Sequence, residues 1–372
     1  MSALLVTTTL ATLQMSSPTN PYADAHLSPD GVGDLRPTAL QVIRDEGLVN
    51  KLVGKVMLVT GASSGIGIDT VAALHATGAD VYMQIRDMKK GKEVMEKILA
   101  SSEGTGKIDL IEMELGSFES IRTGVANFLK MSNKLNVLIN NAGKRCTVLP
   151  SRDITVYISG TDAKYPGVRN TPEGRTRDGF ETQFGVNHLA HFLLFQLLRP
   201  TLLASSSPSF NSRVVNVTSG SHARSQMHFD NLNLEGMYDG RLAYAQSKTA
   251  NILMANEIDR LYGDKGLHAL SVHPGCIRTG LQRHGPLNNQ LSSEVLRVEK
   301  SSAQGAATQV WAAVGRVWDG KGAKYLEDMR EGQPVEKPSV TTGGYRAFAF
   351  DEGGMKKLWA VSCEMVGVSD IK

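Results

Sequence analysis

The chain has 372 residues, of which 41% are hydrophobic and 21% charged, and its net charge is +3. This length and composition exclude a small disulfide-stabilised protein, a multispanning membrane protein and a wholly disordered chain. The 40 basic and 37 acidic residues are interspersed, so we expect no nucleic-acid partner. Three widely spaced cysteines and short apolar runs lead us to expect a cytoplasmic protein without stable membrane insertion.

The first part of the chain, residues 1–50, is rich in Thr, Ser and Pro. Such a composition predicts a partly disordered N-terminal extension rather than a domain. Residues 38–48 alone show a helical pattern, which Gly47 would end and which could pack on the main body.

From Lys55 onward, short buried-type runs alternate with longer helical patterns, which is typical of a doubly wound parallel sheet. The predicted strands are residues 56–60, 80–85, 137–140, 213–217 and 268–273. The predicted helices are residues 66–77, 90–101, 118–131, 180–203, 242–262 and 303–313. We therefore predict a single α/β domain of the Rossmann type over residues 51–372. Two irregular stretches, 144–178 and 283–300, are expected to be variable loops near a substrate pocket.

A glycine-rich turn follows the first predicted strand, where GASSGIG places Gly61, Gly65 and Gly67 before the first helix. Glycines there let a dinucleotide pyrophosphate approach the free N–H groups of the helix. Gly-rich turns are also common without a ligand, so this motif needs support from later ones. The second strand ends in Arg86, whose guanidinium favours the 2′-phosphate of NADP(H), although Arg86 and Asp87 could instead form a solvated turn.

A tyrosine and a lysine, Tyr244 and Lys248, stand four residues apart and project from one face of the predicted helix 242–262. The ammonium of Lys248 would favour the phenolate form of Tyr244, which suits the tyrosine to acid or base catalysis. Ser219, after the strand 213–217, could donate a hydrogen bond to a substrate carbonyl. A Tyr–Lys pair at this spacing is by itself more often a surface pair, so its interpretation depends on the other motifs.

These motifs together resemble the short-chain dehydrogenase/reductase family: TGASSGIG, NNAG at residues 140–143, Asn187 in VNHLAHF, Ser219, YAQSK, and HPGCIRT at residues 273–279. They stand in the family's order from about residue 54 to about residue 282. Within the family, IRDMKKG, DGFETQFGVNHLAHF and the long segment between Ser219 and Tyr244 are similar to the retinol dehydrogenase-like branch.

The resemblance implies an oxidoreductase that reduces a ketone, aldehyde or imine of a hydrophobic small molecule with NADP(H), or oxidises the alcohol in reverse. Tyr244 would be the general acid or base, Lys248 would bind the nicotinamide ribose, Ser219 would orient the carbonyl, and Asn187 would support a proton-relay water. The residues implied to bind the cofactor are Gly61, Ser63, Ser64, Gly65, Ile66, Gly67, Arg86, Glu114, Leu115, Asn141, Ala142, Gly143, Tyr244, Lys248, Pro274, Gly275, Ile277 and Thr279. Glu114 and Thr218 depart from the family's usual Asp and Ser.

Two other hypotheses stay open. The protein could bind NADP(H) as a sensor or scaffold without turnover, or its pocket could also direct an isomerisation or cyclisation. Among nine histidines, His188 and His191 share a helix face but lack the HExxH spacing, so we expect no metal. The helix 180–203 is apolar enough to pack on the sheet, and its remaining apolar face is a candidate homodimer interface.

Overall fold

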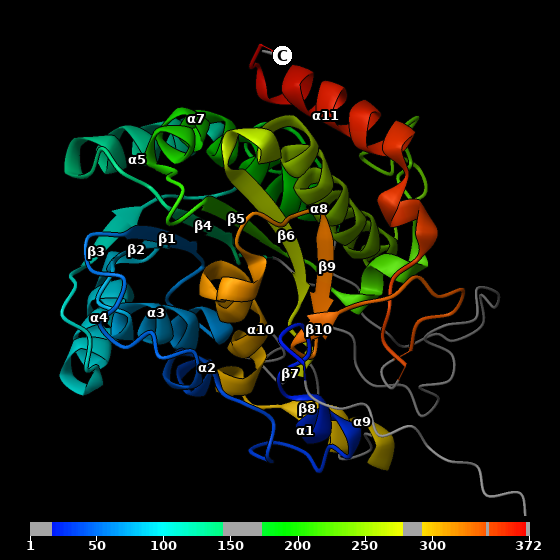
Figure 1. Ribbon diagram of the computed structural model, residues 1–372. Helices are drawn as coiled ribbons and strands as arrows, with labels where there is room; N and C mark the ends of the chain where they lie inside the picture. The colour runs from blue at the N-terminus through cyan, green and yellow to red at the C-terminus, as the bar shows by residue number, and fades with distance from the viewer. Residues whose placement is uncertain (1–16, 144–172, 278–291, 340–341, 370–372) are drawn as a thin grey trace, which may run out of the picture.

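The structure, a computed structural model, describes residues 17–143, 173–277, 292–339 and 342–369. Its main sheet has the strand order β10-β9-β6-β5-β4-β1-β2-β3, and all neighbouring pairs are parallel except β9 with β10 (Figure 1). A separate two-stranded sheet pairs β7 with β8. The strands are β1 (Val56–Thr60), β2 (Asp80–Ile85), β3 (Ile108–Glu112), β4 (Val137–Asn140), β5 (Ser212–Val217), β6 (Leu267–His273), β7 (Cys276–Ile277), β8 (Glu299–Lys300), β9 (Lys324–Glu327) and β10 (Arg330–Glu331).

Helices cover both faces of the main sheet, as a doubly wound fold requires (Figure 1). One face carries α2 (Ala39–Asp45), α3 (Ile66–Ala76), α4 (Met88–Ser101) and α10 (Ser302–Val314). The other face carries α5 (Phe118–Met131), α7 (Ala190–Ser205), α8 (Gly240–Tyr262) and α11 (Glu352–Val366). The prediction of a doubly wound parallel α/β fold is therefore confirmed.

The predicted strands and helices lie where the patterns place them, and their ends agree within two residues. The main difference concerns the predicted helix 180–203, which is not one continuous α-helix. It consists of a short turn α6 (Thr182–Phe184), a π-helical turn η2 (Gly185–Leu189) and then α7. Strands β3, β9 and β10 and helix α11 have no counterpart among the predicted elements.

The described part of the N-terminal segment is more ordered than its composition predicts. It forms α1 (Ala23–Leu27) and α2, and the side chains of Val42 and Ile43 are fully buried beside α3 and α10. The buried Arg36 donates to the carbonyl oxygens of Val298 and Glu299, at 2.9 and 2.6 Å. Residues 17–50 are therefore anchored to the domain, whereas residues 1–16 lie outside the described residues.

The apolar face of α7 has a partner within its own chain. Phe192 and Phe195 are buried, and their rings lie 5.0 and 6.1 Å from that of Trp359 on α11. Helix α11 lies across α8 at the outside of this layer (Figure 1). These side chains are therefore not available to a second copy of the chain.

The two segments expected to be variable loops are described only in part. Residues 144–172 and 278–291, which include Thr279, lie outside the described residues. Residues 292–300 are not irregular, because they form α9 (Ser293–Val298) and β8, and β8 pairs with β7 directly after the HPG sequence.

Candidate active site

The site lies at the carboxyl edge of the sheet, where the strand order reverses between β1 and β4. Ligands bind at such a point in doubly wound folds because the loops leave in opposite directions. The turn from β1 to α3 has positive φ at Gly61 (+66°) and Gly65 (+55°), a conformation that favours glycine. A methyl group on Gly67 would collide with the carbonyl oxygen of Gly61. No side chain caps the N-terminus of α3, so its first N–H groups suit a pyrophosphate.

The NNAG sequence is fixed against this turn by Thr60, the last residue of β1. The Thr60 hydroxyl accepts from the backbone N–H groups of Asn141 and Ala142, both at 2.9 Å. The Asn141 side chain in turn donates to the Thr60 carbonyl at 2.8 Å. Sequence analysis did not single out Thr60, although it stands directly before the first glycine.

The opposite end of the candidate cofactor site contains Arg86 and Glu114. The Arg86 guanidinium is 73% exposed and lies 3.6 Å from the Glu114 carboxylate. Asp87 caps the N-terminus of α4 by accepting from the Lys90 amide at 3.1 Å. The Asp87 carboxylate is therefore engaged by the helix, and the charge that faces Arg86 comes from Glu114 instead. Leu115, the next predicted residue, is buried beside it.

Helix α8 carries Tyr244 and Lys248 at adjacent turns of one face, and its N-terminus is fixed by Asp239, which accepts from two backbone amides. The Lys248 Nζ lies 5.6 Å from the centroid of the Tyr244 ring and donates to the Val217 carbonyl at 2.9 Å. Lys248 is 3% exposed, so its charge acts in a poorly solvated environment. The structure therefore brings these two side chains together at the end of β5.

Ser219 lies two residues after the end of β5 and caps the 3₁₀ turn η3 (Gly220–Arg224). Its Oγ accepts from the Ser221 amide at 3.2 Å, while its carbonyl accepts from the Nδ1 of His222 at 2.7 Å. A carbonyl cannot donate, so His222 is protonated on Nδ1. Burial lowers the pKa of His222 to about 4, which keeps the ring neutral.

Asn187 occupies the middle of the π-helical turn η2, a distortion that is frequent at functional sites. Its side-chain amide donates to Ser247 Oγ at 3.0 Å, and that hydroxyl donates to the Tyr244 carbonyl at 2.8 Å. A methyl group on Gly143 would lie 3.4 Å from both Asn187 Oδ1 and Lys248 Nζ. The NNAG loop therefore meets Asn187 and Lys248 at Gly143.

The HPGCIRT sequence is supported by a lysine that sequence analysis missed. Gly275 has φ +94°, and a side chain there would contact the aliphatic part of Lys300. Lys300 is buried and forms an ion pair with Asp328 at 2.6 Å. Ile277 pairs with Lys300 across β7 and β8, and Pro274 lies between β6 and β7. The sequence alone shows only that Lys300 stands shortly before the helix predicted over residues 303–313.

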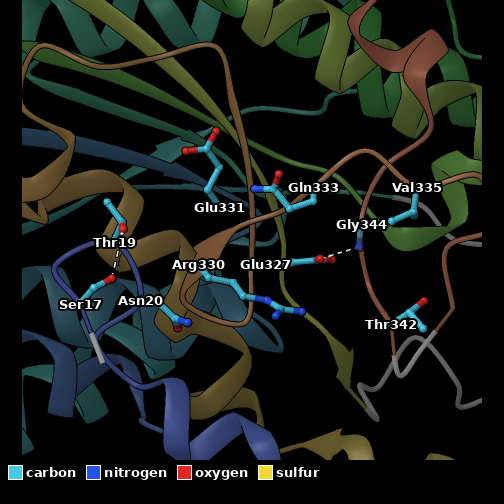
Figure 2. Close-up of a pocket in the computed structure, with 10 residues that line it drawn as sticks. All are labelled: Ser17, Thr19, Asn20, Glu327, Arg330, Glu331, Gln333, Val335, Thr342 and Gly344. Atoms are coloured by element: carbon cyan, nitrogen blue, oxygen red, sulfur yellow. Dashed lines mark hydrogen bonds between the residues drawn. The ribbon is translucent and has the colours of Figure 1, made fainter. Parts of the chain in front are cut away.

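A separate cavity of about 430 Å³ lies beyond β9 and β10 (Figure 2). Glu327 is its most buried ionisable residue and accepts from the Gly344 amide at 2.5 Å and the Tyr325 hydroxyl at 3.4 Å. Burial, with the nearby Asp328, raises the pKa of Glu327 to about 7. The described lining is Ser17, Thr19, Asn20, Glu327, Arg330, Glu331, Gln333, Val335, Thr342 and Gly344, and it includes none of the predicted site residues.

The described ranges offer neither the side-chain arrangement of a metal site nor the helix of a membrane span. No three His, Cys, Asp or Glu side chains in these ranges gather as a metal-binding cluster. His188 and His191 instead bond to Ser362 and Thr60. Of the helices formed by the described residues, none combines the length and apolar character needed to cross a bilayer.

Comparison with known proteins identifies the family. Residues 55–289 match the model described as short chain dehydrogenase. Short-chain dehydrogenase/reductase prx1 of Penicillium rubens is 46% identical over 94% of this chain and 96% of its own length. Retinol dehydrogenase 11 of Homo sapiens is 34% identical over 86% of this chain and 87% of its own.

A solved structure agrees with these sequence relatives. An uncharacterised protein from Mycobacterium paratuberculosis superposes with a TM-score of 0.60 at 27% identity, covering 86% of this chain and 96% of that one. The family consists of oxidoreductases that act on CH–OH and C=O groups of small molecules with a nicotinamide cofactor. The chain therefore belongs to the short-chain dehydrogenase/reductase family, in its retinol dehydrogenase-like branch.

Proposed function

We propose that the protein is an NADP(H)-dependent reductase for a ketone, aldehyde or imine of a hydrophobic small molecule, or catalyses the reverse alcohol oxidation. The observation that carries this proposal is the convergence of Tyr244, Lys248, Asn187 and Gly143 at the carboxyl edge of the sheet. These residues come from α8, η2 and the loop after β4, which meet at the point where this fold binds ligands.

The residues present fit a bound dinucleotide. Gly67 lets the turn after β1 pack closely where a side chain would collide with the Gly61 carbonyl oxygen, and the uncapped N-terminus of α3 offers N–H groups to a pyrophosphate. Gly143 would lie beside the nicotinamide half, and Pro274, Gly275 and Ile277 would lie along its other side. When bound, the cofactor supplies the hydride that the carbonyl carbon accepts.

The chain's own residues then orient the carbonyl and deliver a proton. Ser219 Oγ donates a hydrogen bond to the substrate oxygen, and the Tyr244 hydroxyl transfers its proton to that oxygen as negative charge develops there. The buried ammonium of Lys248 stabilises the phenolate that remains on Tyr244. A water near Asn187 returns a proton to Tyr244. In alcohol oxidation each proton transfer runs in the opposite direction.

Arg86 supports NADP(H) over NAD(H). Its partner Glu114 is 3.6 Å away, and an exposed pair of this kind contributes at most about 1 kcal/mol. Turning the guanidinium from Glu114 to a 2′-phosphate therefore costs little and forms a charge-assisted hydrogen bond. The carboxylate of Asp87 does not compete, because it caps α4.

The first experiment measures consumption of NADPH and NADH with a panel of lipophilic aldehydes and ketones, with identification of the products. Tyr244→Phe should lower kcat by about 10²- to 10⁴-fold because the variant has no acidic hydroxyl. Tyr345→Phe, a tyrosine outside the site, is the matched control and should keep wild-type turnover. Unchanged turnover in Tyr244→Phe would contradict the mechanism.

Failure of wild type to reduce any member of the panel while binding NADPH would favour a sensor or scaffold. Rearranged or cyclised products would favour a pocket that also directs isomerisation.

A second experiment tests the cofactor preference. Arg86→Ala should lower kcat/KM for NADPH by about 10- to 100-fold and leave that for NADH nearly unchanged, since only NADPH carries the 2′-phosphate. Lys89→Ala removes an exposed charge from the same turn and serves as the control. Equal losses with both cofactors would show that Arg86 does not select between them.

A further inference from the structure

A fully buried histidine lies between the cofactor side of the site and Asn187. His191 is in the first turn of α7 and is 1% exposed. Its Nδ1 lies 3.0 Å from the Asn187 carbonyl oxygen, and its Nε2 lies 2.9 Å from the Thr60 hydroxyl at the end of β1. Both ring nitrogens are therefore engaged, and one of them bonds to a residue 131 positions away from His191 in the chain.

The direction of these hydrogen bonds follows from the groups involved. A carbonyl oxygen only accepts, so Nδ1 of His191 must carry the proton that it donates to Asn187. Burial lowers the pKa of His191 to about 4; the bond to Asn187 opposes this shift and the charge of Lys248 adds to it. The ring is therefore neutral near pH 7, and Nε2 accepts from the Thr60 hydroxyl.

Thr60 extends the same chain of bonds to the NNAG loop. With its proton directed at Nε2, the hydroxyl oxygen accepts from the amides of Asn141 and Ala142, both at 2.9 Å. The other acceptor near the Thr60 hydroxyl, the Ile139 carbonyl, is more distant at 3.4 Å. Every donor thus points one way, from the NNAG amides through Thr60 and His191 to the Asn187 carbonyl.

We propose that His191 is a positioning residue that fixes the Asn187 turn relative to the NNAG loop; this inference rests on the proposed function, in which Asn187 serves proton return. The π-helical turn departs from the regular α-helical pattern of backbone hydrogen bonds, so a side-chain donor to the Asn187 carbonyl adds a restraint on it. On its other side, Asn187 is held by Ser247 of α8. Asn187 is thereby held on one side through His191 and Thr60 of β1, and on the other side by α8, the helix that carries Tyr244.

The first test determines the protonated ring nitrogen and needs no turnover. In protein labelled with ¹⁵N-histidine, the signal that disappears in His191→Phe should report a neutral ring with its proton on Nδ1 between pH 5.5 and 8. A proton on Nε2, or a ring that titrates near its ordinary value of 6.5, would overturn the proposal. This measurement can overturn the proposal even where the panel of carbonyl compounds shows no turnover, because it tests the hydrogen bonds of His191 and not the proposed function.

The second test compares variants that keep different parts of the ring. His191→Asn retains an amide donor near the Nδ1 position, whereas His191→Phe retains neither polar atom and His191→Gln presents its amide toward Thr60. We expect kcat to fall about tenfold in His191→Phe and His191→Gln and to recover at least half in His191→Asn. The dissociation constant of NADPH should change by less than about threefold in all of them. Equal kcat in His191→Asn and His191→Gln would contradict the proposal, and this pair suffices if His191→Phe does not fold.

Two controls separate positioning from general destabilisation. His75 is also buried and bonded at both nitrogens, to Ser102 and Gly106, on the face of the sheet away from Asn187. His75→Phe should lower the melting temperature without changing kcat. In an Asn187→Ala background, His191→Phe should have no further effect on kcat, because its effect acts through Asn187. A full additional tenfold loss in that background would overturn the proposal.

Discussion

Three histidines, in η2, α7 and η3, and one glutamate at the end of β9 are buried to a similar degree, yet their pKa values shift in opposite directions. Burial lowers the pKa of His188 to about 3 and those of His191 and His222 to about 4. Burial raises the pKa of Glu327 to about 7. The common cause is the cost of placing a charge in a poorly solvated interior, which favours the neutral form of either group.

The partners of these groups follow from their neutrality. Each histidine bonds to an uncharged group, namely Ser362, the Asn187 carbonyl or the Ser219 carbonyl. Glu327 likewise bonds to a backbone amide and a phenol, while the adjacent Asp328 pairs with the buried Lys300. The histidines and Glu327 should therefore destabilise the fold at opposite ends of the pH range.

The largest expected effect lies on the acid side. A group with a lowered folded-state pKa adds stability above its unfolded value, and that stability is lost as the pH falls toward the folded value. For the three histidines this loss runs from pH 6.5 toward pH 4 and amounts to about 2 kcal/mol for each at pH 5. Urea unfolding at pH 8 and pH 5 measures this loss of stability. Equal unfolding midpoints at the two pH values would contradict the prediction for the histidines.

For Glu327 we predict that stability changes with pH in the opposite direction. A raised folded-state pKa adds stability that is complete below pH 4.5 and is lost as the pH rises to about 7. Glu327→Gln keeps the neutral form at every pH, so relative to wild type it should gain about 3 kcal/mol between pH 4.5 and pH 8. Urea unfolding at both values tests this.

Glu331→Gln is the control for Glu327→Gln, because Glu331 lines the same cavity but is 37% exposed and paired with Lys324. Glu331→Gln should show no comparable gain in unfolding free energy relative to wild type between pH 4.5 and pH 8. A similar gain in both variants would assign the effect to the cavity's net charge rather than to burial of Glu327.

The smallest expected effect concerns the hydrogen bond of one of these histidines, His188. Ser362→Ala removes the partner of His188 Nε2 at 2.8 Å, and Nδ1 of this ring already has no bonded partner among the described atoms. The buried imidazole would then lose its hydrogen bond, at a cost of about 1–2 kcal/mol in unfolding free energy at pH 8. Ser209→Ala, which removes an exposed hydroxyl, should stay within about 0.5 kcal/mol. No difference between the two would show that the His188 bond adds no stability.

The cofactor side of the site was predictable because its chemistry constrains the backbone. Gly61, Gly65 and Gly67 stand where other residues would be strained or collide, and Tyr244 and Lys248 meet through helical spacing alone. The glycine motif and the Tyr–Lys pair each lie within a few consecutive residues, so the sequence shows them directly. The parallel sheet was likewise predictable from the alternation of short buried runs with helical patterns along the chain.

The missed features depend on contacts between distant segments. Helix α11 begins with Glu352, Gly353 and Gly354, and glycines lower helix propensity, so its stability comes from packing of residues such as Trp359. The chain of bonds through His191 joins β1 to α7, and the sequence shows only that His191 follows Asn187 by four positions. Pairing of this kind requires the folded structure.

The π-helical turn at Gly185–Leu189 also changes the directions in which the side chains of α7 point around the helix axis. A residue advances an α-helix by about 100°, so one extra residue in a turn displaces the downstream side chains by about that angle relative to a regular helix. After this turn Asn187 bonds to Ser247, whereas Phe192 and Phe195 pack on Trp359. A one-residue deletion in the turn would leave every downstream residue chemically intact and rotate it away from its partner.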